Sequence, residues 1–254
     1  MKRPAGRPML ALEARRAVDQ AVRALGDPRA RPNVAWLAQL TGASAEELSA
    51  VLAETERLLP FEDEIRRRHR DGGRPHYAQF RAPFELYAMV RLLRPDHVIE
   101  TGVSSGVSSA HFLLALRRNR RGTLHSIDLP TLQRGARFGV QDSPVALPPG
   151  KATGWAIPDE LRAGWDLRIG RSEEILPRLA HHLPSIGVFL HDSLHTPTHL
   201  TFELTTVRPK LASGGVVLAD NTVWTGTAFP KFARTLGSSV RRRGRTDLVG
   251  LRVP

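Results

Sequence analysis

The sequence predicts an α/β protein with a mostly parallel sheet and helices on both faces. From residue 97 onward, short β-rich runs alternate with helical stretches, and strands that alternate with helices form parallel sheets with right-handed crossovers. The β-rich runs are HVIET (97–101), TLHSID (123–128), DLRIG (166–170), IGVFLHD (186–192) and GGVVLAD (214–220). Two more, near Val240 and at 248–253, flank a turn and predict an antiparallel C-terminal edge, which makes seven strands.

The residues before this alternating pattern predict a helical extension. An apolar stripe favours a helix over Leu12–Leu25, and VAWLAQL (34–40) precedes a turn at Gly42. Ser44 and Glu47 have the spacing of a capping box, which predicts a second helix from about Ala45. A charged stretch ending in DGGRP and a helix opened by Pro83 follow. We therefore expect an extension over residues 1–80 and a main domain over 81–254.

Helix, glycine turn and helix is also the pattern of a DNA-binding helix-turn-helix. The second helix, AEELSAVLAETERLL, is acidic, whereas a recognition helix presents base-reading and phosphate-binding groups. A lid or an oligomerisation arm is therefore the favoured interpretation of residues 1–80, and a DNA-binding regulator is the alternative.

Composition excludes several classes of protein. The 254-residue chain has 41% apolar residues, a formal net charge of +12 and no cysteine. It therefore has no disulfides, thiolate nucleophiles or cysteine-bound metals. Its basic clusters lack interleaved aromatic residues, so nucleic-acid binding is not expected. Without an apolar run of about 20 residues or a signal peptide, we expect no membrane span and a cytoplasmic location.

Acidic side chains follow most of the predicted strands, at the edge where open parallel sheets bind ligands. These residues are Glu100, Asp128, Asp192 and Asp220. Buried unpaired carboxylates are costly, so we interpret them as parts of a ligand site.

The first strand ends in a turn with the sequence ETGVSSGVSS. Gly102 and Gly106 allow a sharp bend close to a ligand, Ser104 and Ser108 add hydroxyl groups, and the next helix presents free amides. The G-x-x-x-G spacing differs from the dinucleotide pattern. Asp128, at the end of the second strand, could accept hydrogen bonds from both ribose hydroxyls. Turn and acid together predict a nucleoside ligand, although each alone also fits an ordinary turn or cap.

Five segments in register resemble class I S-adenosylmethionine-dependent methyltransferases with a Rossmann-like sheet, in the branch of catechol and bacterial antibiotic or sugar O-methyltransferases. The segments are VIETGVSSGVSSAHFLLAL, LHSIDLP, LRIGRSEEILPRL, VFLHDSLHTPTHLTFEL and LASGGVVLADN. The resemblance implies that the methionine end of the cofactor is lined by Glu100, Gly102, Ser104, Gly106 and Ser108. It further implies Asp128 at the ribose, and Ser172 with Glu173 at the adenine; Ser172 alone would also fit a helix cap.

The strand-end residues Asp192, Asp220 and Asn221 would offer two carboxylates and an amide oxygen, a set suited to Mg²⁺ or a similar divalent cation. The resemblance implies that such a metal binds the acceptor oxygen. His195, with Asp192, is the candidate catalytic base, although the catechol-type enzymes tend to have lysine there. A zinc site of His191, His195 and His199 is not favoured, because Pro197 begins a new helix between them.

The predicted reaction is O-methylation of a small-molecule hydroxyl. The methyl acceptor is the least determined partner. Trp155 could line the acceptor pocket or anchor a loop to the core. By their positions in the chain, His76, Tyr77 and Trp224 are further candidates for lining this pocket. A nicotinamide-dependent oxidoreductase, which also has a glycine turn and a strand-end acid, is the second alternative.

Overall fold

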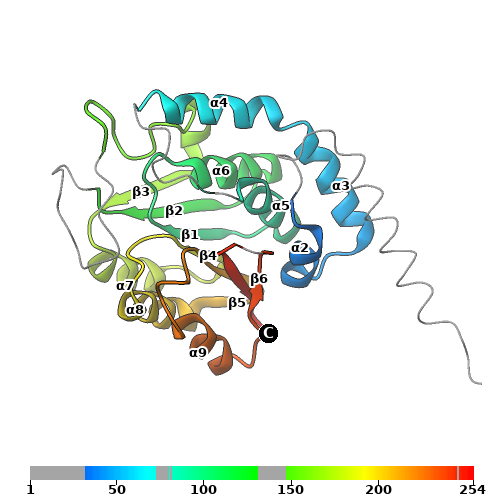
Figure 1. Ribbon diagram of the computed structural model, residues 1–254, viewed down its shortest axis with the longest axis vertical. Helices are drawn as coiled ribbons and strands as arrows, with labels where there is room; N and C mark the ends of the chain where they lie inside the picture. Colours follow the sequence, from blue (N-terminus) through cyan, green and yellow to red (C-terminus); the bar gives the residue numbers. More distant parts are fainter. Residues whose placement is uncertain (1–31, 73–79, 81, 131–146, 245) are drawn as a thin grey trace, which may run out of the picture.

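The computed structural model describes residues 32–72, 80, 82–130, 147–244 and 246–254. Its seven-stranded sheet has the order β3-β2-β1-β4-β5-β7-β6 (Figure 1). The strands are β1 (His97–Thr101), β2 (Thr123–Asp128), β3 (Trp165–Ile169), β4 (Ile186–His191), β5 (Leu211–Ala219), β6 (Arg241–Arg242) and β7 (Val249–Arg252). Strands β1 to β5 pair in parallel, and β7 runs antiparallel to β5 and β6. The predicted fold class is confirmed.

Helices cover both faces of this sheet (Figure 1). One face carries α5 (Pro83–Leu93) and α6 (Val107–Asn119), and the other carries α7 (Ser172–His182), α8 (Pro197–Val207) and α9 (Ala228–Thr235). Short 3-10 turns, η2 (Asp159–Gly164) and η3 (Arg208–Lys210), lead into β3 and β5. The parallel strands are therefore buried between two helical layers, as parallel sheets require.

The strands supply apolar side chains to two cores, one on each face. In β4, Val188 and Leu190 belong to the core under α5 and α6, whereas Phe189 belongs to the core under α7 and α8. All three side chains are fully buried. Because successive side chains of a strand point to opposite faces, a continuous apolar run fills both cores at once.

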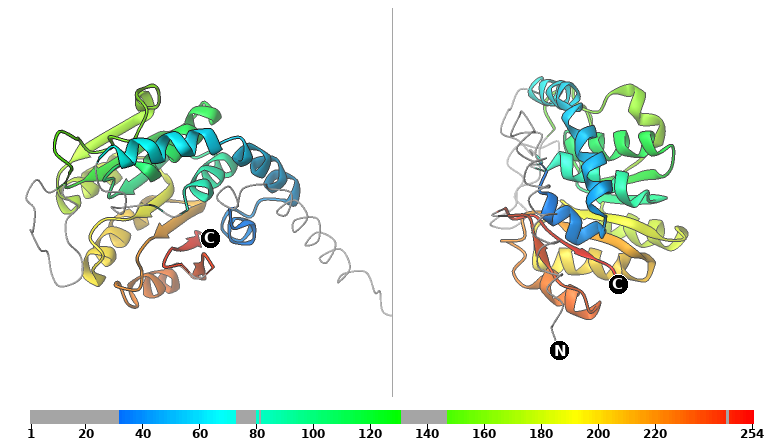
Figure 2. Two further views of the ribbon diagram at one scale, coloured as in Figure 1. Left: turned by 45° about the horizontal axis from the view of Figure 1, so that its top comes forward. Right: turned by 90° about the vertical axis from the view of Figure 1, so that its right-hand side faces the viewer.

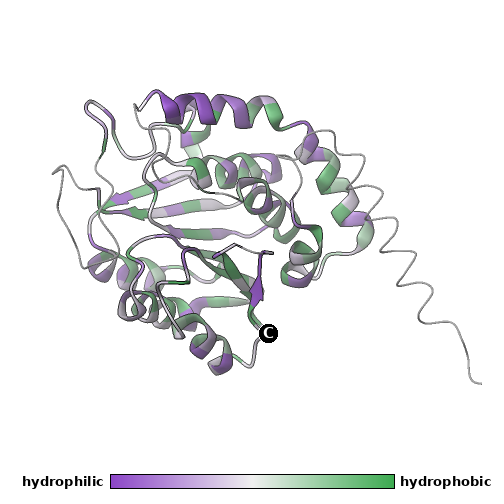
Figure 3. Cartoon of the chain, viewed as in Figure 1, coloured by the Kyte–Doolittle hydropathy of each residue, from purple (hydrophilic) through white to green (hydrophobic). Residues whose placement is uncertain are grey.

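Three further helices belong to this side of the molecule (Figure 2). Helix α2 (Val34–Thr41) packs beside α5 on β5 and β7, whereas α3 (Ala45–Glu56) packs on α5 and α4 (Leu59–Arg70) packs on α6. The capping box is confirmed: Ser44 N donates to Glu47 Oε2 (2.7 Å), and Glu47 N donates to Ser44 Oγ (3.2 Å). Hydrophilic residues dominate α4, whereas the strands of the sheet carry both hydrophilic and hydrophobic residues (Figure 3).

The apolar face of α3 is turned toward the sheet domain. Leu48, Val51 and Leu52 are buried, and Arg91 of α5 donates to both oxygens of Glu54 at 2.8 Å. This packing agrees better with an extension of the domain than with a separate DNA-binding unit. The boundary between residues 80 and 81 stays a prediction, and the helix expected at 12–25 lies outside the described residues.

One element begins earlier than expected. Strand β5 begins at Leu211, before the expected residue 214, because its pairing with β4 changes register between Ile186 and Val188. Gly214, with φ +75°, lies in this irregular part of the strand. Because glycine is a poor strand former, the sequence pattern does not indicate the strand residues before it. Among the described residues, no helix is long and apolar enough to cross a bilayer.

Candidate active site

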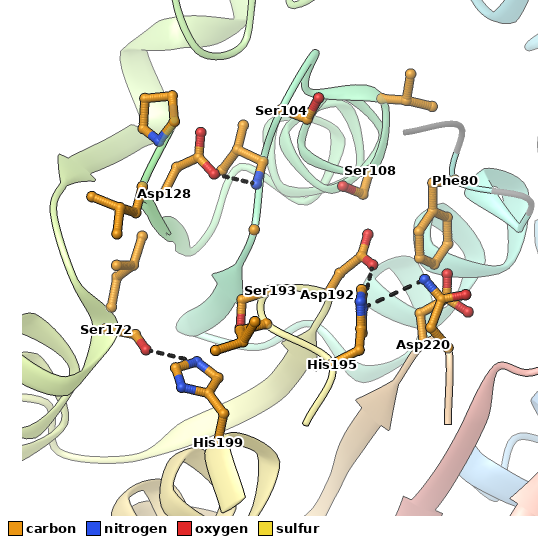
Figure 4. A pocket seen from close by; sticks show the side chains of 18 of the residues that line it. Phe80, Ser104, Ser108, Asp128, Ser172, Asp192, Ser193, His195, His199 and Asp220 are labelled. Atoms are coloured by element: carbon orange, nitrogen blue, oxygen red, sulfur yellow. Dashed lines mark hydrogen bonds and ion pairs between the residues drawn. The ribbon is translucent and has the colours of Figure 1, made fainter. Parts of the chain in front are cut away.

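A cavity of about 520 Å³ opens at the carboxyl ends of the parallel strands (Figure 4). Residues that follow each of these strands line it: Gly102, Asp128, Gly170, Asp192 and Asp220. Three strand-end aspartates therefore face one pocket, at the position where open α/β sheets bind their ligands.

The loop after β1 depends on glycine. Gly102 has φ +86°, and its N–H donates to the carbonyl of Ile127 (2.9 Å). A Cβ atom added to Gly102 would lie only 2.0 Å from the carbonyl oxygen of Asp192. Gly106, also left-handed at φ +87°, is the N-cap of α6. The bend thus brings the ends of β1 and β4 together beside the helix N-terminus.

Gly102→Ala should lower the free energy of unfolding by about 2–5 kcal/mol, because a side chain there meets both a left-handed backbone and the Asp192 carbonyl. Urea unfolding would measure this loss. Gly164→Ala is the matched control, since the nearest atom to its added Cβ is 4.0 Å away. Equal stability of the two variants would contradict the steric role of Gly102.

Asp128 is tied to the same loop. Val103 N–H donates to its Oδ1 (3.2 Å), and Thr153 Oγ1 donates to its Oδ2 (2.9 Å). Burial raises the pKa of Asp128 above its ordinary value, although these hydrogen bonds oppose the rise. The carboxylate lines the pocket beside the glycine turn (Figure 4), in the arrangement predicted for ribose binding.

Glu100 differs from expectation, because it is fully buried behind the loop and is not among the pocket-lining residues. Its carboxylate accepts hydrogen bonds from the hydroxyls of Ser108, Ser109 and Ser126. Burial raises its pKa to about 7. Of these residues, Ser108 reaches the pocket wall, as does Ser104 from the loop. The structure therefore makes Glu100 a buried partner of the pocket-lining Ser108, whereas the sequence predicts a direct contact of Glu100 with the cofactor.

At the opposite end of the pocket lie Ser172 and Glu173, the predicted adenine residues. Capping does not explain Ser172: α7 begins at Ser172 itself, and its N-cap, Arg171, makes no side-chain cap hydrogen bond. Instead, Ser172 Oγ is 3.1 Å from His199 Nε2.

His195 occupies the wall between β4 and β5 (Figure 4). Its Nε2 lies 3.4 Å from Asp192 Oδ1 and 3.5 Å from Asn221 Nδ2. Asn221 has a left-handed backbone with φ +51°. The predicted base and all three predicted metal ligands, which include Asp220, thus lie at one end of the pocket.

The described residues contain no group of three or more His, Cys, Asp or Glu side chains that could hold a metal ion. A metal site here would therefore require the Asn221 amide as its third ligand. The histidines considered for zinc have different partners: His191 Nδ1 and His199 Nε2 contact Glu203, whereas His195 contacts Asp192.

Aromatic and charged side chains complete the pocket near His195. Trp224 is 39% exposed, and its ring centroid is 5.8 Å from that of His195. Phe80 and Arg243 also line this end. Trp155 does not line the pocket, and its ring stacks on His69 of α4 at 6.1 Å, so it anchors its loop to the N-terminal helices. The candidates His76 and Tyr77 lie outside the described residues.

The sequence reasoning did not identify Phe80 or Arg243 as pocket residues, did not consider Glu203, and considered His199 only as a zinc ligand. The last two had a signal: they are spaced i, i+4 on α8 and bonded to each other at 3.0 Å. Polar residues on the buried face of an amphipathic helix are costly without partners, and this could have indicated a buried polar cluster. Phe80 and Arg243 belong to irregular segments, where no helix or strand periodicity predicts which way a side chain points.

A doubly covered sheet with a glycine bend and a strand-end acid in one pocket is the arrangement in which open α/β sheets bind nucleotide-like ligands. Residues 99–222 match the family model described as a methyltransferase domain. Residues 99–222 are therefore similar to a methyltransferase domain, which agrees with the resemblance to class I, S-adenosylmethionine-dependent methyltransferases. The match does not favour the nicotinamide or DNA-binding alternatives.

Solved structures share the fold at low sequence identity. A putative O-methyltransferase from Klebsiella pneumoniae is 16% identical with a TM-score of 0.52, over 76% of this chain and 90% of that chain. The S-adenosylhomocysteine-bound methyltransferase PaMTH1 from Podospora anserina is 14% identical with a TM-score of 0.51, over 100% and 99%. The O-methyltransferase TomG from Streptomyces achromogenes, in complex with S-adenosylmethionine, is 19% identical with a TM-score of 0.50, over 76% and 89%. No curated protein matches the chain.

Proposed function

We propose that this methyltransferase transfers the methyl group of S-adenosylmethionine to a hydroxyl oxygen of a small molecule. One observation carries the proposal: a single cavity joins the Gly102–Asp128 pair, suited to an adenosyl donor, to His195 and Asp192, suited to a hydroxyl acceptor. A volume of about 520 Å³ lies within the range of small-molecule sites.

In the proposed reaction, the acceptor oxygen attacks the sulfonium methyl carbon. The new O–C bond forms as the S–C bond breaks, and S-adenosylhomocysteine leaves with the bonding electron pair. His195 Nε2 takes the hydroxyl proton, and the Asp192 carboxylate, 3.4 Å away, stabilises the resulting imidazolium. Alignment of donor and acceptor in one enclosed pocket supplies much of the rate enhancement.

The finer proposal is that a divalent cation assists. Asp192, Asp220 and Asn221 would hold it; their two carboxylates and one amide oxygen fit the hard-oxygen preference of Mg²⁺ in kind. Bound there, the ion would lower the proton affinity of the acceptor hydroxyl.

Chelation tests the metal separately from the reaction. We expect exhaustive EDTA treatment to reduce methyl transfer by about tenfold or more, with recovery on added Mg²⁺. The affinity for S-adenosylhomocysteine should not change, because the Asp128 side of the pocket needs no metal. Full activity after chelation would leave His195 as the base of a metal-free reaction.

Labelled cofactor tests the activity itself. The protein would be incubated with methyl-labelled S-adenosylmethionine and matched acceptors: phenols and sugar alcohols, with their amine and thiol counterparts. Label in an ether product supports the proposal, whereas transfer only to nitrogen or sulfur acceptors contradicts it.

A further inference from the structure

A buried carboxylate lies behind the adenine side of the pocket. Glu203 of α8 is fully buried. Its Oε2 accepts hydrogen bonds from Thr101 Oγ1 (2.8 Å) and His191 Nδ1 (2.7 Å), and its Oε1 from Ser193 Oγ (3.0 Å) and His199 Nε2 (3.0 Å). Burial alone would raise the pKa of Glu203, but its histidine and hydroxyl partners outweigh burial and hold the pKa well below its usual range. Glu203 is thus a buried anion.

His199 lies between this anion and a second acid. Its Nε2 is 3.0 Å from Glu203 Oε1, and its Nδ1 is 3.4 Å from Glu173 Oε1. A neutral imidazole has one N–H, so it would turn a lone pair toward one of the two carboxylates. Only the imidazolium donates to both. The position of His199 between two carboxylates therefore favours its protonated form.

This protonation determines the direction of the neighbouring hydroxyl. Ser172 Oγ is 3.1 Å from His199 Nε2. Because the single N–H at that nitrogen is shared between Glu203 Oε1 and Ser172 Oγ, Ser172 accepts from it and turns its own O–H away from it. Ser172 and Glu173 both line the pocket (Figure 4). The pocket wall thus has a hydroxyl donor next to a carboxylate acceptor.

We infer that His199, kept as an imidazolium by Glu203, is a positioning residue that makes this wall specific for adenine. The Ser172 hydroxyl would donate to ring N1, and the Glu173 carboxylate would accept from the 6-amino group. Hypoxanthine, which has an N–H at position 1 and a carbonyl at position 6, presents the reverse pattern. The inference rests on the proposed function, because it takes the ligand to be an adenosyl donor.

The groups that face His199 predict a pH dependence. They are Glu203 and Phe202 from α8, Glu173 and Ser172 from α7, and His191 from β4. Burial lowers the pKa of His191, although Glu203 opposes this effect. Burial would also lower the pKa of His199, but its ion pairs with the two acids raise it above the ordinary value. Cofactor affinity should therefore be full at low pH and lost as pH rises through this raised pKa.

Calorimetry with S-adenosylhomocysteine tests the inference on the full chain. Between pH 6 and 9 we expect wild-type affinity to fall by about tenfold, as one linked proton allows. Titration at pH 8 in buffers of different ionisation enthalpy should show proton uptake on binding. His199→Gln should bind more weakly, with a flat pH profile and no proton uptake. The control is His182→Gln on exposed His182, whose Nδ1 faces the Arg178 carbonyl at the end of α7; it should behave as wild type.

S-inosylhomocysteine provides a second measurement. The wild-type protein should bind it about 100-fold more weakly than the adenosyl compound, because the hypoxanthine edge would leave the Ser172 hydroxyl and the Glu173 carboxylate unpaired. In His199→Gln, the ratio of the two affinities should be smaller. If both proteins show the same pH profile and the same ratio, the inference is overturned while the methyltransferase proposal stands. If wild type binds S-adenosylhomocysteine at no pH, the proposed function itself fails. If His199→Gln does not fold, two measurements on the wild-type protein still test the inference. They are the proton uptake on binding and the ratio of the affinities for the adenosyl and inosyl compounds.

Discussion

His195→Gln should lower kcat for methyl transfer by about 10²- to 10⁴-fold, the usual contribution of a positioned general base. The imidazole is 92% buried, and its Nε2 faces Asp192 at 3.4 Å on the acceptor side of the pocket. Glutamine keeps a polar side chain of similar length but cannot take the hydroxyl proton. Initial rates with labelled cofactor, at saturating acceptor, would measure the loss.

Affinity for S-adenosylhomocysteine separates this catalytic loss from a damaged pocket. It should be unchanged in His195→Gln, because the predicted cofactor residues lie on the β1, β2 and β3 side of the pocket. His181→Gln, at the end of α7, is the matched control and should retain full kcat. A His195→Gln protein with wild-type kcat would remove His195 from the mechanism.

Asp128→Ala should weaken binding of S-adenosylhomocysteine by about 100-fold, because two hydrogen bonds from ribose hydroxyls to a buried carboxylate are lost. Isothermal titration calorimetry measures this effect without knowledge of the acceptor. Asp128 also accepts from Val103 N–H, so part of the loss would come from a loosened glycine loop.

Two further variants resolve that ambiguity. Asp128→Asn keeps one acceptor oxygen for the loop and should bind with intermediate affinity. Asp159→Ala removes a carboxylate whose side chain is 96% exposed, and should bind as wild type. Undiminished affinity in Asp128→Ala, with its unfolding transition intact, would contradict the ribose assignment.

The sheet could be predicted because its signals are local. The runs at 97–101 and 123–128 are short, β-rich and bounded by turns, and both strands form over those residues. The strand-end acids then followed from topology, since parallel strands carry their carboxyl ends to one edge. This is why Asp128, Asp192 and Asp220 could be grouped before their contacts were known.

Side-chain direction could not be predicted in the same way. Glu100 and Asp128 both end a β-rich run, yet Glu100 lies behind the loop and Asp128 lies in the pocket. The direction of each side chain depends on the pleat of its strand and on the neighbouring strand. Ser126 on β2 donates a hydrogen bond to Glu100. The sequence likewise left a helix cap open as an alternative role for Ser172, whereas in the structure His199 of α8 lies beside its hydroxyl. Contacts between distant segments carried this information.

The order of the strands also bears on how copies of this protein could associate. Its two outermost strands are β3 and β6. Asp166 and Arg168 form an ion pair on β3 (3.0 Å), and β6 is only two residues long, with both arginines exposed. Short, charged borders disfavour strand-by-strand docking between molecules. Stable self-association, if it occurs, would therefore have to use the helical layers.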